Sequence, residues 1–186
     1  CSLDMHVKLK LRSELPNIIR GCNASGLMVT HDPEEAMSIC DKVAVLNEGK
    51  IHQIDTPINL LNNPKTIFVS SFILGNNILY LEKKGNSYLS CLGEIDSSAL
   101  LNNTNIKNMS ISPKFISIKK SKAGNATVIS KEFLGEFLIY KVFINEAILR
   151  VRTNINNVLD NGDKCSLSLT KNSYYFLFPG AHKVYI

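Results

Sequence analysis

The sequence predicts two parts, an α/β segment followed by an all-β segment, with the change near Gly75. Before Gly75, apolar residues keep helical spacing over residues 11–22, and short helices alternate with short strands. That alternation is typical of a mainly parallel sheet. After Gly75, apolar strands follow one another with turn residues between them, which is typical of a small barrel or sandwich.

Apolar residues at positions 11, 15, 18 or 19, and 22 predict a first helix, and Pro16 lies inside it. A proline clashes with the carbonyl four residues earlier, so we expect a kink there or a second helix that starts at Pro16. The polar residues 23–26 end this unit.

An apolar run, residues 27–30, follows and predicts a buried strand that ends at His31. Asp32 is a predicted N-cap, Pro33 suits the first helical position, and Glu35 completes a capping-box pattern. A helix is therefore expected immediately after His31.

Two further elements of the first part have clear local signals. Residues 43–46 predict a strand, residues 47–50 a turn, and residues 51–54 an antiparallel return strand. Thr56 and Pro57 then predict the start of a short helix that runs through Leu61.

The second part is predicted to be all β. Residues 97–108 are rich in Asn and Ser and are expected to form a loop. The predicted strands cover residues 78–82, 88–92, 109–118, 126–133, 136–144, 147–153, 164–170 and 174–178.

Composition narrows the class of protein. The net charge of +5 modestly favours an anionic partner, but the lysines are spread along the chain. The densest group, at positions 114, 119, 120 and 122, is expected to be a solvated strand end. The five cysteines lack metal-site spacing and are expected to be small buried residues in a reducing compartment. No apolar run is long enough to span a membrane.

His31 is the candidate functional residue. In open α/β sheets, phosphate ligands bind where strands end and helix N-termini begin. An imidazole at that edge can donate a hydrogen bond to a phosphoryl oxygen. The alternative is a histidine that is satisfied by a loop carbonyl.

The neighbours of His31 carry a longer pattern. Residues 27–57 resemble the switch-histidine region of ABC-transporter ATPase subunits, with Lys42 in place of the usual Arg and Asp55 in place of the usual Gly. The matching segments are Thr-His-Asp at 30–32, Glu-Glu-Ala at 34–36, Val-Ala-Val at 43–45, Gln53, and Thr-Pro at 56–57.

Residues 1–4 resemble the end of the same family's D-loop, with Cys1 in the place of its serine. The sequence contains no Gly-x-x-x-x-Gly-Lys-Ser/Thr phosphate loop, no ABC signature and no Walker B carboxylates. We therefore expect the chain to be the C-terminal part of a longer polypeptide.

The second part resembles the OB-like β-domain, called the transport-associated domain, that follows importer ATPases. Three segments carry this resemblance: residues 111–114, residues 132–136 with the following Tyr140, and residues 159–164. Ser112 and Lys114 depart from the family's Arg and Glu. The aromatic residues 133, 137, 140, 143, 174, 175, 176 and 178 could form a stacking platform for bases, but strands this apolar are expected to face a core.

The resemblance implies the C-terminal portion of a P-loop ABC ATPase domain over residues 1–74 and an OB-like β-barrel over residues 75–186. It implies that His31 is catalytic and contacts the γ-phosphate of ATP, and that Asp4 crosses the interface of a homodimer. ATP and Mg²⁺ are implied for the full-length protein only, and this chain alone is expected to bind neither and to be inactive.

The implied partners are a second ATPase subunit and transmembrane permease subunits, on the cytoplasmic face of the cell membrane, and no nucleic acid is expected. Residues 132–136 with Tyr140 look most similar to ferric-iron importers, with polyamine, sugar and sulfate importers as alternatives. A different class of function is a free-standing OB-like module that binds an oligonucleotide or a small oxyanion.

Overall fold

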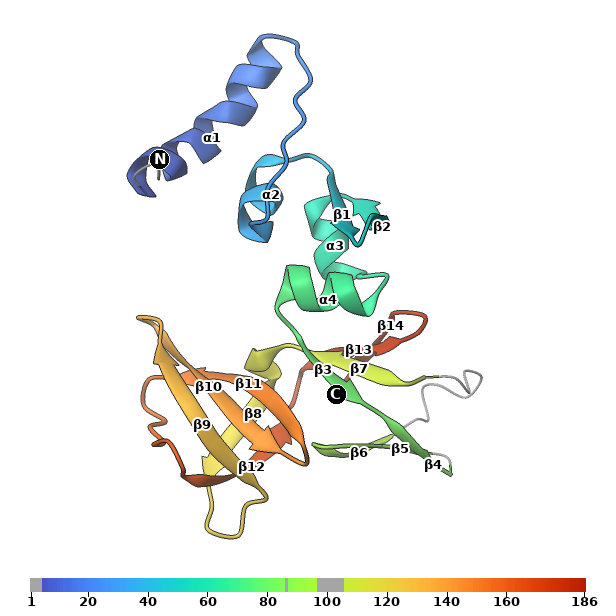
Figure 1. Ribbon diagram of the computed structural model, residues 1–186, viewed down its shortest axis with the longest axis vertical. Helices are drawn as coiled ribbons and strands as arrows, with labels where there is room; N and C mark the ends of the chain where they lie inside the picture. Colours follow the sequence, from blue (N-terminus) through green and yellow to red (C-terminus); the bar gives the residue numbers. More distant parts are fainter. Residues whose placement is uncertain (1–4, 86, 97–105) are drawn as a thin grey trace. The chain divides into compact units, whose positions relative to one another are not determined.

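The computed structural model describes residues 5–85, 87–96 and 106–186. The chain divides into two compact units, residues 1–73 and residues 74–186. The first unit contains short helices and a two-stranded sheet, and the second contains antiparallel sheets (Figure 1). The predicted change at Gly75 lies close to this division. The fold therefore combines small helices with antiparallel sheets.

Helix α1 (Met5–Gly21) continues through Pro16, so the alternative of a second helix starting at Pro16 is wrong. Proline lacks a backbone N–H and therefore removes one hydrogen bond of the helix, whereas the turns before and after it keep their backbone hydrogen bonds. Cys22, directly after α1, is exposed, which corrects the expectation that the cysteines are buried.

Residues 27–30 do not form the expected buried strand. They are extended and unpaired, and the side chains of Leu27 and Val29 are 95% and 92% exposed. The strand is missing because a strand needs a hydrogen-bonded neighbour. The two described strands of this unit, β1 (Val43–Asn47) and β2 (Lys50–Asp55), pair with each other. They are antiparallel, so the expected parallel sheet is also wrong.

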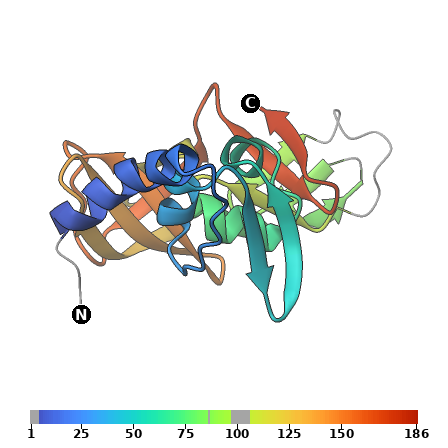
Figure 2. The ribbon, with the colours of Figure 1, turned by 90° about the horizontal axis from the view of Figure 1, so that it is seen from above.

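The β1–β2 hairpin itself is confirmed and is seen from above in Figure 2. Its turn residues Glu48 and Gly49 have positive φ angles of 48° and 72°, as tight hairpin turns require. Thr56 caps helix α3 (Pro57–Asn62), because its hydroxyl accepts a hydrogen bond from the Asn59 N–H.

Asp55, where the ABC family usually has glycine, stabilises the same helix start. Its carboxylate accepts hydrogen bonds from the Asn59 side-chain amide at 2.7 Å and from the Thr56 N–H at 2.9 Å. These bonds hold the pKa of Asp55 below its usual range, with the Asn59 bond as the largest cause. Aspartate in place of glycine therefore gives the start of α3 a second side-chain hydrogen-bond acceptor, in addition to the Thr56 hydroxyl.

Gln53 connects β2 to the chain that precedes helix α4 (Ile67–Leu74). Its buried side-chain amide donates to the Asn63 carbonyl at 3.1 Å, and its Oε1 accepts from the Lys65 N–H at 2.8 Å. The core beside it is small and contains Val43, Val45, Leu60 and Val69.

The second unit holds three antiparallel sheets. Neighbouring strands in each sheet are hydrogen-bonded. The order of strands in the first sheet is β11-β10-β9-β12-β8, in the second β14-β13-β7-β3, and in the third β4-β5-β6. The strands of the first sheet are β8 (Ile116–Lys120), β9 (Ala126–Phe133), β10 (Phe137–Ile144), β11 (Ala147–Asn154) and β12 (Lys164–Leu169). Those of the other two are β3 (Asn77–Tyr80), β7 (Asn108–Ile111), β13 (Tyr174–Phe178), β14 (His182–Tyr185), β4 (Glu82–Lys84), β5 (Ser87–Ser90) and β6 (Gly93–Asp96).

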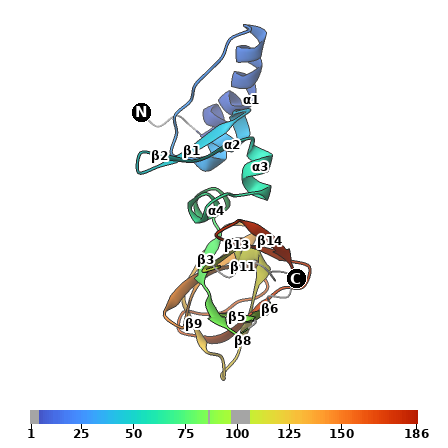
Figure 3. The same ribbon diagram turned by 90° about the vertical axis from the view of Figure 1, so that its right-hand side faces the viewer.

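One hydrophobic cluster joins these three sheets. It includes Tyr88 from β5, Met109 from β7 and Tyr140 from β10. Figure 3 shows the strands of this unit from another side, with β5, β8 and β9 labelled. The Tyr140 hydroxyl donates to the Asn157 carbonyl and accepts from the Leu159 N–H, both at 2.9 Å. The core thereby anchors the loop between β11 and β12.

Several strand predictions for this unit are confirmed, most closely residues 126–133, which form β9. The predicted strand 109–118 is broken by the 3₁₀ turn η2 (Pro113–Phe115), so that β7 and β8 belong to different sheets. Proline has no N–H to donate to a sheet ladder, which accounts for the break. The predicted loop 97–108 lies mostly outside the described residues, and Asn108 begins β7.

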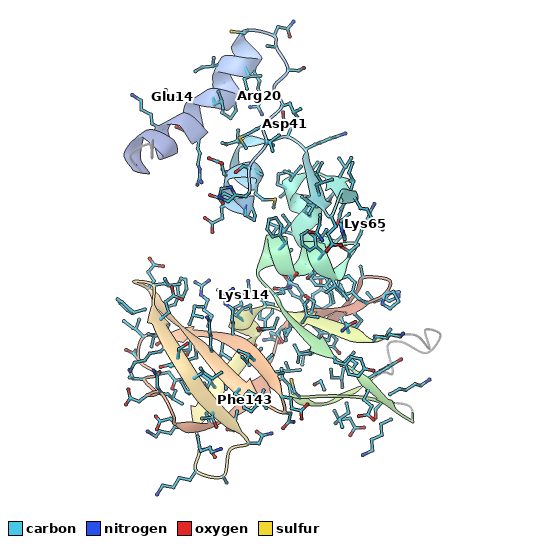
Figure 4. The ribbon with its side chains drawn as sticks, viewed as in Figure 1. Glu14, Arg20, Asp41, Lys65, Lys114 and Phe143 are labelled. Carbon is cyan, nitrogen blue, oxygen red and sulfur yellow. The ribbon has the colours of Figure 1, made fainter. Side chains whose placement is uncertain are left out.

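The aromatic residues divide between the core and the surface. Tyr140, Tyr175 and Phe176 are buried, as expected, whereas Phe133 and Phe143 are exposed. Phe143 is labelled in Figure 4. The expectation of a core position is therefore wrong for these two. Phe143 lies in a stretch of β10 whose side chains alternate between the core and the solvent, whereas Phe133 lies at the end of β9, where residues 131–133 are all exposed.

We expect Asp163 to make the second unit sensitive to acid. Its carboxylate bonds the Lys120 ammonium at 2.7 Å, and this bond is the largest cause of its lowered pKa. Since the pKa is lower in the folded state, the stabilisation is complete above the unfolded pKa of about 3.9 and is lost as the pH falls through the folded pKa. Urea denaturation at pH 5 and pH 3 should therefore show a smaller loss of stability for Asp163→Asn than for wild type. Glu82→Gln, at an exposed position, should behave as wild type; equal acid sensitivity of all three proteins would contradict the expectation.

Candidate functional site

His31 lies in a bend between residues 27–30 and helix α2 (Pro33–Ile39). Its imidazole is exposed and makes no hydrogen bond or ion pair with the residues that the structure describes. The alternative of a histidine satisfied by a loop carbonyl is therefore not seen. The side chain is available to a ligand.

Thr30, directly before His31, is fixed by two hydrogen bonds. Its hydroxyl donates to the Glu35 carboxylate at 2.7 Å and accepts from the Asp32 N–H at 3.1 Å. In a capping box the Glu35 carboxylate would accept from the N–H of the N-cap, Asp32. In the structure Glu35 accepts from the Thr30 hydroxyl instead, and the Thr30 hydroxyl accepts from the Asp32 N–H. Sequence reasoning gave Thr30 no structural role.

Asp32, directly after His31, is the N-cap of α2, as predicted. Its Oδ1 accepts hydrogen bonds from the Glu34 N–H at 2.9 Å and from the Glu35 N–H at 3.3 Å. Its Oδ2 accepts from the Arg12 guanidinium of α1 at 3.1 Å. Both neighbours of His31 are thus held by side-chain hydrogen bonds.

The contact with Arg12 is a second feature that sequence reasoning missed. Arg12 is 20 residues from Asp32 in the sequence, and no local pattern predicts such a pair. A second ion pair joins the same helix to the end of α2, between Arg20 and Asp41 at 2.8 Å (Figure 4).

The described residues contain no candidate metal site. Within residues 5–85, 87–96 and 106–186, no group of three or more His, Cys, Asp or Glu side chains could hold a metal ion. Asp4 lies outside the described residues, so the structure does not place it beside His31. At this position the described residues offer the exposed imidazole of His31 to a phosphate, and they contain no ligand set for Mg²⁺.

Two of the motif departures in the second unit have structural consequences. Ser112 precedes η2 without a side-chain cap, and the Lys114 ammonium lies 4.9 Å from the centre of the Phe115 ring (Figure 4). A cation–π contact thus occurs where the family has glutamate. Gly135 and Gly162 have φ angles of 76° and 88°, as predicted for their turns.

No helix in the described part of the chain is long and apolar enough to cross a membrane. No family model matches the sequence.

Curated proteins do match parts of the chain. The chain is 44% identical over 88 residues to the spermidine/putrescine import ATP-binding protein PotA of Bacillus thuringiensis (strain Al Hakam), covering 47% of this chain and 26% of that protein. It is 36% identical over 140 residues to the protein of the same name from Mesoplasma florum, covering 72% of this chain and 40% of that protein. The protein of that name from Trichormus variabilis is 43% identical over 77 residues, covering 41% of this chain and 20% of that protein.

The chain thus spans between about a fifth and two-fifths of the length of these relatives. Their names give polyamines as the imported solutes, so the expectation of ferric iron has no support. Over the residues matched, the chain belongs with the ATP-binding subunits of ABC importers, as the resemblance of residues 27–57 predicts.

Proposed function

We propose that this chain is part of the ATP-hydrolysing subunit that energises an ABC importer of polyamines. The observation that carries the proposal is the 44% identity over 88 residues to proteins named for spermidine and putrescine import. The ordered pattern of residues 27–57 supports the ATPase part of this proposal independently of those names.

In this proposal His31 contacts the γ-phosphate of the substrate ATP. Its exposed imidazole would donate a hydrogen bond to the phosphoryl oxygen on which negative charge develops during transfer. Mg²⁺, bound to the nucleotide, would neutralise phosphate charge and be held by residues outside this chain. The hydrogen bonds of Thr30 and Asp32 would hold the backbone of His31 in place before the nucleotide arrives.

We also propose the domain assignment and the partners. Residues 1–74 are the C-terminal portion of the ATPase domain, and residues 75–186 are the transport-associated OB-like domain. The exposed apolar side chains of Leu27 and Val29 support the first assignment, since a strand of that domain's sheet would cover them. Asp4 would lie at the interface with a second ATPase subunit, and permease subunits would bind the dimer at the cytoplasmic membrane face.

Uptake by cells that lack their own polyamine importers tests the solute. The full-length protein, expressed with the permease and receptor genes beside its own gene, is expected to support uptake of radiolabelled spermidine but not of ferric iron. Wild-type and His31→Ala proteins should be compared, so that uptake is tied to this subunit. Uptake of iron without spermidine would contradict the proposed solute and leave the ATPase assignment unchanged.

A further inference from the structure

We propose that Arg12 is a positioning residue for His31, acting through its ion pair with Asp32. The inference rests on the proposed function of His31, because it concerns how that imidazole is held for hydrolysis. The contact joins α1 to the N-cap of α2, so the position of His31 depends on a helix that is remote in the sequence.

The carboxylate of Asp32 divides its two oxygens between two tasks. Oδ1 accepts the two N–H groups at the start of α2, whereas Oδ2 accepts the Arg12 guanidinium. The cap fixes Asp32 relative to α2, and the ion pair fixes it relative to α1. Removing Arg12 leaves the cap intact but frees the carboxylate from α1.

Thr30, on the other side of His31, bonds Glu35 and the Asp32 N–H, and both of these lie at the start of α2. Among the described residues, the other hydrogen bonds that hold the His31 bend are local to residues 30–36. The Arg12 contact therefore joins this local unit to α1 at the N-cap itself, whereas the Arg20–Asp41 pair joins α1 to the chain after α2.

Stability alone does not account for Arg12. Its side chain is only 23% exposed, and its buried Nε has no hydrogen-bond partner among the described residues. A partly buried guanidinium with an unsatisfied Nε–H carries a desolvation cost, so this pair is a poor source of net stability. A positional role explains why a guanidinium, rather than an apolar side chain, occupies this place.

The chain offers a matched control on the same helix. Arg20 pairs with Asp41 at 2.8 Å, and both side chains are largely exposed, at 63% and 84%. That pair links α1 to the far end of α2, away from His31. Exposed pairs contribute little, so its loss should leave the His31 bend unchanged.

Steady-state ATP hydrolysis by the full-length protein tests the inference. Arg12→Met is expected to lower kcat by about tenfold to a hundredfold, while KM for ATP changes by less than about threefold. Arg12→Lys should recover part of kcat, because it restores the charge without the fork of the guanidinium. Arg20→Met should retain wild-type kcat. Wild-type kcat in Arg12→Met would overturn the inference.

Asp32→Asn separates the ion pair from the cap, because asparagine caps a helix as well as aspartate does. We expect the same loss of kcat as in Arg12→Met, with the Glu34 and Glu35 amides still protected from hydrogen exchange. If amide protection is lost together with kcat in both variants, the role is merely structural and the inference is wrong. His31→Ala is measured alongside: if it keeps wild-type turnover, the proposed function fails, whereas if it alone loses turnover, only the role of Arg12 fails.

Discussion

Replacing His31 by alanine in the full-length protein is expected to lower kcat for ATP hydrolysis by about 10²- to 10³-fold, as loss of a single transition-state donor does in other enzymes. The imidazole would bond the γ-phosphate most strongly when charge develops on it, whereas other residues of the full-length protein hold ground-state ATP. The Kd for ATP should therefore change little. Phosphate release measures kcat, and equilibrium titration with a fluorescent ATP analogue measures the Kd.

His52 provides the control for this experiment. It lies in the same unit, where its Nδ1 is 3.2 Å from the Thr66 hydroxyl and its ring packs against Phe68. His52→Gln should keep near-normal turnover, since the contacts described for this residue, with Thr66 and Phe68, are structural. Near-normal turnover in His31→Ala would instead show that His31 is not catalytic.

Gly124→Ala is expected to destabilise the second unit by about 3 kcal/mol or more, the upper end of what overpacking costs. A Cβ at this position would lie 2.1 Å from the Cys165 carbonyl oxygen and 2.3 Å from its carbon. Both atoms belong to the backbone of β12, which is paired with β8 and β9 and has little freedom to move. Urea denaturation of the 186-residue chain, followed by circular dichroism, measures the change in the free energy of unfolding.

Gly21→Ala is the matched control. Its Cβ would meet no atom within 4 Å, and Gly21 ends α1 without a positive φ angle. Alanine has the higher helix propensity, so this variant should be neutral or more stable by up to about 1 kcal/mol. Equal stability of the two alanine variants would contradict the close approach between Gly124 and β12.

The sequence predicts those elements whose hydrogen bonds are local. Asp32 and Thr56 cap their helices because each accepts from an N–H two or three residues away, and the β1–β2 turn is similarly short. The prediction for residues 27–30 is wrong, because their apolar pattern indicates a strand but does not identify the segment that would pair with it. The break at Pro113 has a local cause, yet the sheets that β7 and β8 enter depend on contacts far along the chain.

At the candidate site, too, the sequence predicts local contacts but not contacts between residues that are far apart in the chain. The pattern around His31 identified the histidine and its cap, since those residues are contiguous. The contact between Arg12 and Asp32 spans two helices and became visible only in the structure. The expectation of ferric iron rested on residues 132–136, which lie at the exposed end of the β9–β10 hairpin. Gly135 there meets a turn requirement for a positive φ angle, which carries no information about the solute.

A structure of the full-length protein trapped with a non-hydrolysable ATP analogue tests the central claim most directly. The account predicts that an imidazole nitrogen of His31 lies within about 3.2 Å of a γ-phosphate oxygen. It also predicts that Asp32 still bonds both Arg12 and the start of α2 in that state. An imidazole directed away from the nucleotide, with another side chain contacting the γ-phosphate, would contradict the account.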